Sequence, residues 1–259
     1  MMKKILLIFI LISVLGSLFG QDSLKYRSRI HLKTTLGADI PISKLYNDDI
    51  TDNLWYGKHS FSWQIYSISF FINDYWGIEN SLHLLFTNDN QKRPKQMREY
   101  FSLNYPNHYL YTTMYDNFSS THGRCLISLI YRYETTRFYI YPRFMTGIYF
   151  MRFSSESYYL KGLNPDDFLK ISYKPEKTNP TYGIVGLSAS IGYKLSKRFY
   201  LNLDIPFFYT RVNTKYTKTI TDMDSNTVLE EETAGRKKNL FSFNPSLGFI
   251  IVLKHSRNL

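Results

Sequence analysis

Cysteine is almost absent from this sequence of 259 residues, in which Cys125 is the single cysteine. One cysteine cannot close an internal disulfide, so hydrogen bonding and packing must hold the fold together. The sequence also lacks an apolar run of the roughly 20 residues that a transmembrane helix needs, and its mean hydropathy is −0.29. These absences exclude an internally disulfide-bonded fold and argue against a helical membrane protein.

The N-terminal 20 residues have the order of a secretory signal peptide. Lys3 and Lys4 precede an apolar run over 5–15, and small residues then lead to polar Gln21. The apolar run is too short to cross a bilayer as a helix. We therefore predict a signal peptide over 1–20 and one domain over 21–259; a retained N-terminal anchor is the alternative. No cysteine lies near the cleavage site, which excludes a lipoprotein anchor.

Acidic residues are scarcer than basic ones, with 21 Asp and Glu against 32 Lys and Arg, so the formal net charge is +11. An exported protein does not meet nucleic acid in its normal location, so this excess gives no case for a nucleic-acid partner. Aromatic residues are abundant at 17%, with 23 Tyr and 19 Phe. Both favour β-strands, and Tyr suits a membrane–water interface because its ring is apolar and its hydroxyl is polar.

Long extended segments rich in Tyr, Phe, Ile and Thr recur along the chain, and no helical period is sustained. A tilted strand needs about 9–11 residues to cross a bilayer, and nearly all of these segments have that length. The predicted strands are 28–40, 59–72, 76–88, 122–133, 138–151, 180–194, 199–212 and 240–254.

The connections between these strands alternate in length, which is typical of outer-membrane barrels with short periplasmic turns and long extracellular loops. The short turns are 73–75, 134–137 and 195–198, and the long connections are 41–58, 89–121, 152–179 and 213–239. We therefore predict an all-β fold: a closed antiparallel transmembrane β-barrel of about eight strands in the outer membrane of a Gram-negative bacterium. A soluble secreted barrel of the lipocalin type, whose apolar face points inward, is the alternative.

Side chains alternate along the predicted strands as a membrane barrel requires. In the seventh strand, Phe199, Leu201 and Leu203 share an apolar face, while Asp204 lies on the opposite one. We assign the apolar face to lipid and the polar face to the lumen. Alternation is less regular in 59–72 and 122–133, and a bulge near Tyr66 would account for the irregularity in the first of these strands.

Two short segments resemble the outer-membrane β-barrel families of Bacteroidetes: the end of the signal peptide, Phe19-Gly20-Gln21, and the hairpin 191–203, IGYKLSKRFYLNL. The resemblance covers architecture across the whole mature chain, although few specific residues carry it. It implies either a small eight-stranded barrel or an accessory barrel of secretion or gliding machinery. One departure is the tail 255–259, because many outer-membrane proteins end on an aromatic residue that the assembly machinery recognises.

An eight-stranded barrel has a lumen that side chains can fill, so we predict a plugged interior rather than a channel. Counting residues from the turns gives two expected lumen ion pairs, Arg143 with Asp204 and Glu79 with Arg132. An anion-attracting lumen is the alternative interpretation, because bases outnumber acids on the inward face. Alternation points the following residues inward: Arg29, Lys33, Asp39, Glu79, His83, Arg124, Arg132, Tyr139, Tyr141, Arg143, Tyr149, Lys194, Tyr200, Asp204 and Lys254.

No motif predicts catalysis, a cofactor or a metal. None of the six histidines has a metal-ligand spacing. His122 with Ser119, Ser120 and Asp116 could serve a lipid-modifying enzyme, as in some small outer-membrane barrels, but any polar loop offers such a set. We expect no enzyme activity, no cofactor and no metal.

The long connection 89–121 is rich in aromatic residues, and its predicted partner-binding residues are Tyr100, Phe101, Tyr105, Tyr109 and Tyr111. Exposed tyrosine is an adaptable contact residue on a loop; alternatively, these rings extend neighbouring strands and pair across them. We expect a non-enzymatic barrel with a structural or surface-interaction role. Its expected partners are outer-membrane lipid and, through the loops, envelope proteins or glycans. A secretion or gliding accessory and a lipid-modifying enzyme are the alternatives.

Overall fold

The computed structural model describes residues 29–42, 60–87, 92–115, 121–153, 155–164 and 167–253. The predicted signal peptide, the inward position expected at Lys254, the tail 255–259 and most of the predicted long connection 41–58 lie outside these ranges. The described ranges contain thirteen strands, all antiparallel to their neighbours, and one helix. No helix within them combines the length and the apolar character needed to cross a membrane.

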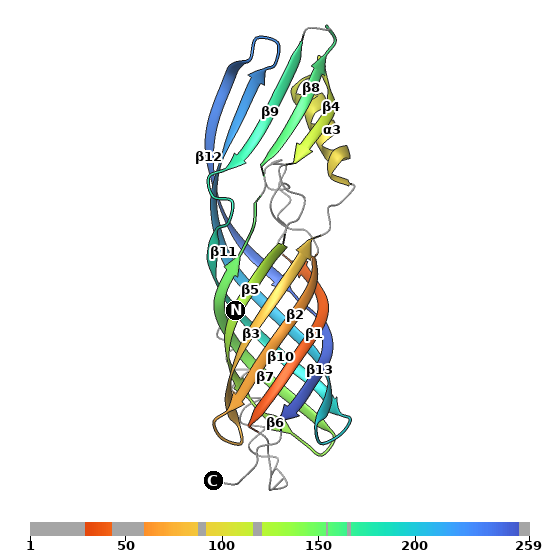
Figure 1. The fold of residues 1–259 in the computed structure, drawn as a ribbon, viewed down its shortest axis with the longest axis vertical. Helices are drawn as coiled ribbons and strands as arrows, with labels where there is room; N and C mark the ends of the chain where they lie inside the picture. Colours follow the sequence, from red (N-terminus) through yellow and green to blue (C-terminus); the bar gives the residue numbers. More distant parts are fainter. Residues whose placement is uncertain are drawn as a thin grey trace.

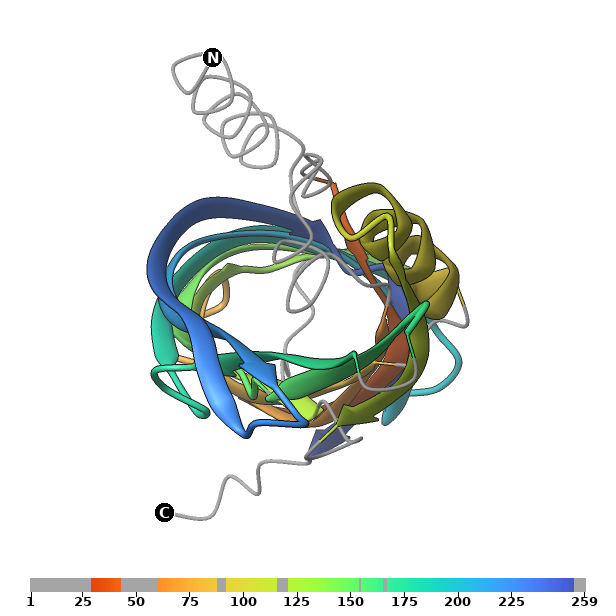
Figure 2. The same ribbon diagram turned by 90° about the horizontal axis from the view of Figure 1, so that it is seen from above.

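Eight strands close a barrel, which Figure 1 shows from the side and Figure 2 along its axis. Closure is visible in the register, because Leu247 pairs with Leu36 on one side and with Leu203 on the other. The predicted eight-stranded closed barrel is therefore confirmed. Its strands are β1 (Ile30–Pro41), β2 (Ser60–Phe71), β3 (Trp76–Thr87), β5 (Thr121–Tyr131), β7 (Phe138–Phe150), β10 (Thr181–Lys194), β11 (Phe199–Asp222) and β13 (Ser246–Leu253).

The eighth wall strand is interrupted at Asn244 and Pro245, which separate β13 from β12 (Thr227–Phe243). Proline has no N–H to donate to a ladder, so a strand breaks or bulges where one occurs. The carbonyl oxygen of Pro245 still accepts from Ala38 N at 3.1 Å, and Asn244 N donates to the Pro206 oxygen at 3.0 Å. The wall therefore continues across the break from β13 into β12.

Three short turns join strands at the lower end of the barrel in Figure 1, as predicted. In the first, Asn73 Oδ1 accepts from the backbone N–H groups of Tyr75 and Trp76. In the third, Ser196 Oγ accepts from the N–H groups of Arg198 and Phe199. Side chains of this kind stabilise tight turns by replacing backbone partners. The middle turn also contains the two-residue strand β6 (Tyr133–Glu134), which pairs with β7.

Side-chain alternation in the barrel follows the predicted faces. On β11, Phe199 and Leu201 are exposed on the outside, while Tyr200, Asn202 and Asp204 are buried. The expected bulge in β2 is present, since the pairing with β3 shifts between Gln64 and Tyr66. The outside is therefore apolar and the inside polar.

The long connections are more ordered than expected. They contain α3 (Lys92–Asn104), β4 (His108–Tyr115), β8 (Glu156–Gly162) and β9 (Phe168–Pro175), and β11 and β12 extend far above the barrel. These strands form one sheet in the order β12-β11-β9-β8-β4, called the extracellular sheet below. Loops were expected over 89–121, 152–179 and 213–239, and the structure has these strands and α3 there instead. Short and long connections do alternate along the chain, but three of the long ones form a second sheet above the membrane wall.

Candidate functional site in the lumen and the extracellular sheet

The outer surface of the barrel is a continuous apolar belt. On β11, outward residues from Phe199 to Tyr209 are all Phe, Leu, Ile or Tyr, and Phe199 and Phe207 are each 50% exposed. This length fits the roughly 9–11 residues that a tilted strand needs to cross a bilayer. Aromatic pairs mark the upper rim, where the Tyr209 and Phe241 ring centroids are 4.9 Å apart. An apolar belt with aromatic edges is the surface that a bilayer covers.

The middle of the lumen holds two cations and two anions in alternation, Lys33, Glu79, Arg143 and Asp204, called the central quartet below. They come from β1, β3, β7 and β11, and each side chain is at most 5% exposed. Lys33 Nζ lies 2.7 Å from Asp204 Oδ2 and 3.7 Å from Glu79 Oε1. Arg143 reaches Asp204 Oδ1 from Nη1 at 3.3 Å and Glu79 Oε2 from Nε at 3.6 Å. Each buried charge therefore has two opposite neighbours.

Serine hydroxyls complete the central quartet. Ser69 Oγ donates to Glu79 Oε2 at 2.9 Å. Ser190 lies between Arg143 and Asp204, where its oxygen accepts from the guanidinium and its hydroxyl donates to the carboxylate. Buried charges need such additional hydrogen bonds because ion pairing alone does not replace water.

The two expected ion pairs have different outcomes. Arg143 and Asp204 are in contact, but Glu79 belongs to the central quartet and Arg132 Nε lies 3.8 Å from Glu134 Oε1 instead. The register explains this, because Glu79 pairs with Ser128 on β5 and Arg132 is four residues further toward the turn. Four strand residues are about 13 Å. These partners replace the expected Glu79–Arg132 pair.

The upper lumen contains a second ion pair, between Arg124 on β5 and Asp39 on β1. Both terminal nitrogens of Arg124 donate to the two carboxylate oxygens at 2.9 Å, which is the bidentate geometry of strong pairs. The guanidinium also lies over the rings of Phe208, at 4.4 Å, and Tyr149, at 5.0 Å. Asn244 Nδ2 donates to Asp39 Oδ1 at 3.3 Å. A charged pair and aromatic rings therefore cross the lumen here.

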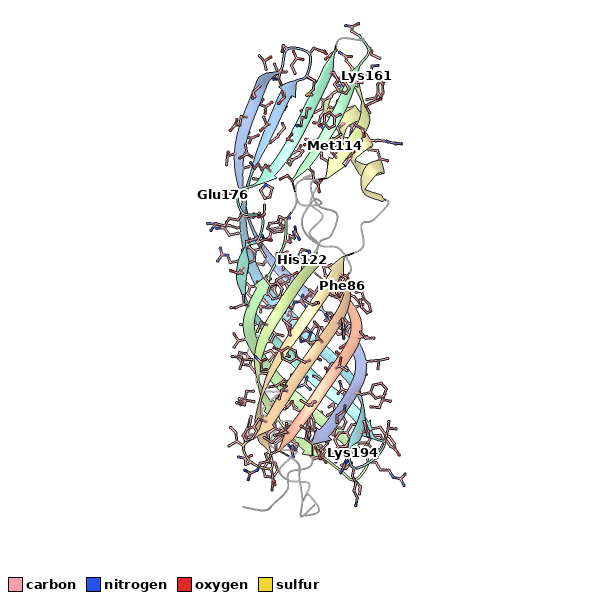
Figure 3. The ribbon with its side chains drawn as sticks, viewed as in Figure 1. Phe86, Met114, His122, Lys161, Glu176 and Lys194 are labelled. Atoms are coloured by element: carbon pink, nitrogen blue, oxygen red, sulfur yellow. The ribbon has the colours of Figure 1, made fainter. Side chains whose placement is uncertain are left out.

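Aromatic rings gather around Glu134 in the lower lumen. Lys194 Nζ lies 2.7 Å from Glu134 Oε2, and the Tyr141 hydroxyl donates to the same carboxylate. The Tyr139 and Tyr141 ring centroids are 4.6 Å apart, and Tyr139 and Tyr200 follow at 5.4 Å. Lys194 marks this lower end in Figure 3.

Above the barrel, the inner face of the extracellular sheet is mostly apolar, and the buried Glu156 on β8 accepts from the Tyr158 hydroxyl there. Tyr158, Leu160 and Ile171 on β8 and β9 are fully buried and belong to one cluster with Val212 on β11. Burial raises the pKa of Tyr173 above its ordinary value, and the neighbouring tyrosines add to the effect. This face therefore forms a hydrophobic core that lies above the polar lumen.

The five predicted partner-binding aromatics divide between this core and the surface. Phe101 is fully buried and Tyr100 and Tyr105 pack against the core, where Phe101 meets the Tyr158 ring at 5.2 Å. Tyr109 and Tyr111 on β4 are 51% and 63% exposed. The expectation that Phe101 offers a binding surface is therefore wrong, since its ring anchors α3 to the sheet.

Further aromatic and basic residues share the outer face with Tyr109 and Tyr111. Tyr111 meets Phe168 at 5.9 Å between centroids, Phe168 stacks on Tyr159 at 6.2 Å, and Lys170 Nζ lies 5.7 Å from the Tyr159 centroid. Met114 on the same face is 57% exposed and appears with Lys161 in Figure 3. We call Tyr109, Tyr111, Met114, Tyr159 and Phe168 the outer aromatic patch.

The catalytic hypothesis at His122 has little support in the described residues. His122 is buried, and its Nδ1 accepts from Arg152 N at 3.2 Å. Its hypothetical companions Asp116, Ser119 and Ser120 lie outside the described residues. Across the part of the chain that the structure describes, no three His, Cys, Asp or Glu side chains are grouped as metal ligands would be.

Phe168, Tyr159 and Lys170 were not predicted as site residues, because 152–179 has the length of a long extracellular loop. The alternation of Tyr158 and Leu160 with Tyr159 and Lys161 was the available signal. A period of two residues over seven positions predicts a strand with one apolar and one mixed face.

A closed barrel, an apolar exterior and a buried polar lumen together define an integral outer-membrane β-barrel protein. Among solved structures, the chain is similar to Neisserial surface protein A (13% identity, TM-score 0.44, 86% of this chain and 97% of that one). It is also similar to a major outer membrane protein from Thermus thermophilus, with 12% identity, a TM-score of 0.45 and coverage of 86% of this chain and 98% of that one. For the outer membrane protease OmpT from Escherichia coli the identity is 9%, the TM-score 0.32 and the coverage 90% of this chain and 100% of that one. No protein-family model and no curated protein matches the sequence.

Proposed function

We propose that this protein is a non-conducting, non-enzymatic barrel that presents the extracellular sheet to a protein partner outside the cell. The outer aromatic patch carries this proposal. Tyr109, Tyr111 and Met114 are exposed, Tyr159 and Phe168 are partly exposed, and ring contacts join Tyr111, Phe168 and Tyr159 on neighbouring strands. Contiguous exposed apolar surface on a soluble part of a protein marks an interaction site, and aromatic residues and Met are enriched in protein–protein interfaces.

The edge of the extracellular sheet favours a protein over a glycan. In the described part of the chain, β4 pairs only with β8, so one side of β4 faces no other strand. A strand edge of this kind can accept an extended segment of another protein through backbone hydrogen bonds. Tyr109 and Tyr111 lie on this edge strand and would contact the added strand.

The barrel supplies a rigid base for this surface. β11 runs over 24 residues from the lower turn to the extracellular hairpin, so the binding sheet and the membrane wall share one strand. The ion pairs and rings that cross the lumen fit a filled interior. A place among the small barrels of Bacteroidetes is part of the same proposal and depends on the sequence resemblance alone.

Site-specific photo-crosslinking on intact cells tests the proposal. A benzophenone amino acid replaces Tyr111, and the matched control carries it at Leu103, which is 82% exposed on α3. We expect one discrete protein adduct at position 111 that is absent at position 103. Equal adducts at both positions, or none at position 111, would contradict a partner at the outer aromatic patch.

A further inference from the structure

A group of outward-facing cations lies just above the apolar belt on one side of the barrel. Its members are Arg152, which follows β7, Lys177 between β9 and β10, Arg211 and Lys215 on β11, and Lys237 on β12, and all five are exposed. We call these residues the basic band. In Figure 3 the neighbouring Glu176 marks this level, where the barrel meets the extracellular sheet.

The members of the basic band lie on adjacent segments. Lys237 is beside Asn213, which stands between Arg211 and Lys215 on β11. The N–H of Glu176 donates to the Lys215 oxygen, and that of Phe153 donates to the Thr178 oxygen. These bonds place Lys177 between β11 and the end of β7. The band is therefore one surface.

The order of residues along each strand places this surface at the membrane rim. On β11, Arg211 is the next outward residue after Tyr209, and on β7, Arg152 is the next after Phe150. The ring of Tyr209 contacts Phe241 across the strands. Along these strands, the apolar belt is followed within a few residues by the aromatic rim and then by the cations. A bilayer has the same order: hydrocarbon, then the interface, then the charged headgroups.

The cations of the basic band have few acidic neighbours. The cross-strand neighbours of Arg211 and Lys237 are Asn239 and Asn213, which carry no charge. Glu176 is the acid in contact, with Oε2 4.0 Å from Lys215 Nζ, and both of these side chains are more than half exposed. Among the described residues, four of these five cations have no acidic side chain in contact, so their charges can attract an anion.

We propose that the basic band binds the phosphate groups of anionic glycolipids in the outer leaflet, with their acyl chains against the belt below Tyr209. Arginine and lysine clusters beside a membrane recruit anionic headgroups, and a guanidinium matches phosphate with two parallel hydrogen bonds. A lipid contacts the cations through its phosphates and the aromatic rim and belt through its acyl chains, on the same pair of strands. A soluble anion contacts only the cations. This site is independent of the partner proposed for the outer aromatic patch.

Native mass spectrometry of the purified, folded full chain tests the assignment. The probe is lipid A carrying its phosphates, compared with enzymatically dephosphorylated lipid A. We expect Arg211→Gln with Lys237→Gln to bind phosphorylated lipid A about tenfold more weakly than wild type. The charge-preserving variant Arg211→Lys with Lys237→Arg should bind as wild type does. Lys161→Gln with Lys170→Gln removes the same charge from the extracellular sheet and should change nothing.

Three results would overturn the proposal. Equal retention of lipid A by wild type and by the Arg211→Gln, Lys237→Gln variant would show that the basic band does not bind lipid A. Equal retention of the phosphorylated and dephosphorylated probes would show that phosphate is not recognised. Complete competition by millimolar inorganic phosphate would assign the site to a soluble anion rather than a lipid. Heat-modifiable gel mobility checks that each variant is folded.

Discussion

Single residues of the lumen determine whether the barrel interior is stable. The central quartet places each buried charge between two opposite charges, so removing one member leaves its neighbours only partly compensated. An uncompensated buried charge is far costlier than an absent pair. Lumen residues are therefore expected to be sensitive to single changes and tolerant of matched double changes.

A double-mutant cycle on Arg143 and Asp204 tests this coupling. We expect Arg143→Met alone and Asp204→Asn alone each to lower the free energy of unfolding by about 3–5 kcal/mol. The double variant should cost clearly less than the sum, because Lys33 and Glu79 remain as a neutral pair. Urea unfolding in lipid vesicles, followed by tryptophan fluorescence, gives the four free energies.

The control cycle uses Lys218→Met and Glu230→Gln, an ion pair at 3.4 Å in the extracellular sheet whose side chains are 20% and 51% exposed. Pairs near the surface contribute about 0–1 kcal/mol, so these changes should be small. Additive costs at Arg143 and Asp204 would mean that the two groups do not interact across the lumen.

Counting from the short turns predicted one of the two expected lumen pairs and not the other. Arg143 and Asp204 lie on strands that both rise from short turns, so their heights could be compared directly. The predicted Glu79–Arg132 pair is wrong because pairing across β3 and β5 depends on the strand register, which the sequence does not show. Lys33 was expected to face inward, but β1 has no short turn before it from which its height could be counted.

At the scale of secondary-structure elements, the extracellular sheet was not predicted, because the length of a connection does not distinguish a loop from strands that lie above the membrane. A membrane strand needs a continuous belt of outward apolar residues, whereas the outer faces of β8 and β9 mix aromatic residues with polar and charged ones. Their outward residues include Ser157 and Lys170, which disfavour a lipid contact. Most strand boundaries in the barrel were predictable because an apolar outer face alternates there with a polar inner face. The exceptions are β11, which continues to Asp222, and the eighth strand, which is broken at Asn244 and Pro245.

Packing of α3 gives a prediction at this scale. Phe101→Ala should destabilise the extracellular sheet locally by about 3–5 kcal/mol, because it removes a fully buried ring from the core. Leu103→Ala, on the same helix but 82% exposed, should have an effect within about 0.5 kcal/mol. Limited proteolysis of the folded protein in detergent reports the difference.

We expect faster cleavage within 92–104 for Phe101→Ala, while the heat-modifiable mobility of the barrel is unchanged. If both variants resist protease as well as wild type does, α3 is not anchored through Phe101. If the barrel also unfolds, the extracellular core and the lumen form one cooperative unit.

At the scale of the whole molecule, the chain joins three environments along one axis. The outer surface is apolar where the bilayer covers it, the lumen is polar and internally paired, and the extracellular core is apolar again. β11 passes through all three, with Phe199 at the lower rim and Ile220 in the extracellular core. The closed ladder satisfies backbone groups that lipid cannot, and the proposed filled lumen would separate this architecture from that of a pore.

Conductance of the purified protein in planar lipid bilayers tests the filled lumen most directly. Insertion is verified by heat-modifiable mobility of protein recovered from the same vesicles, and a porin with an open lumen serves as the positive control. We expect no unit conductance steps from the wild-type protein, because Arg124, the central quartet and the rings around Glu134 cross the lumen at three levels. Reproducible ohmic steps of uniform large size would contradict the account.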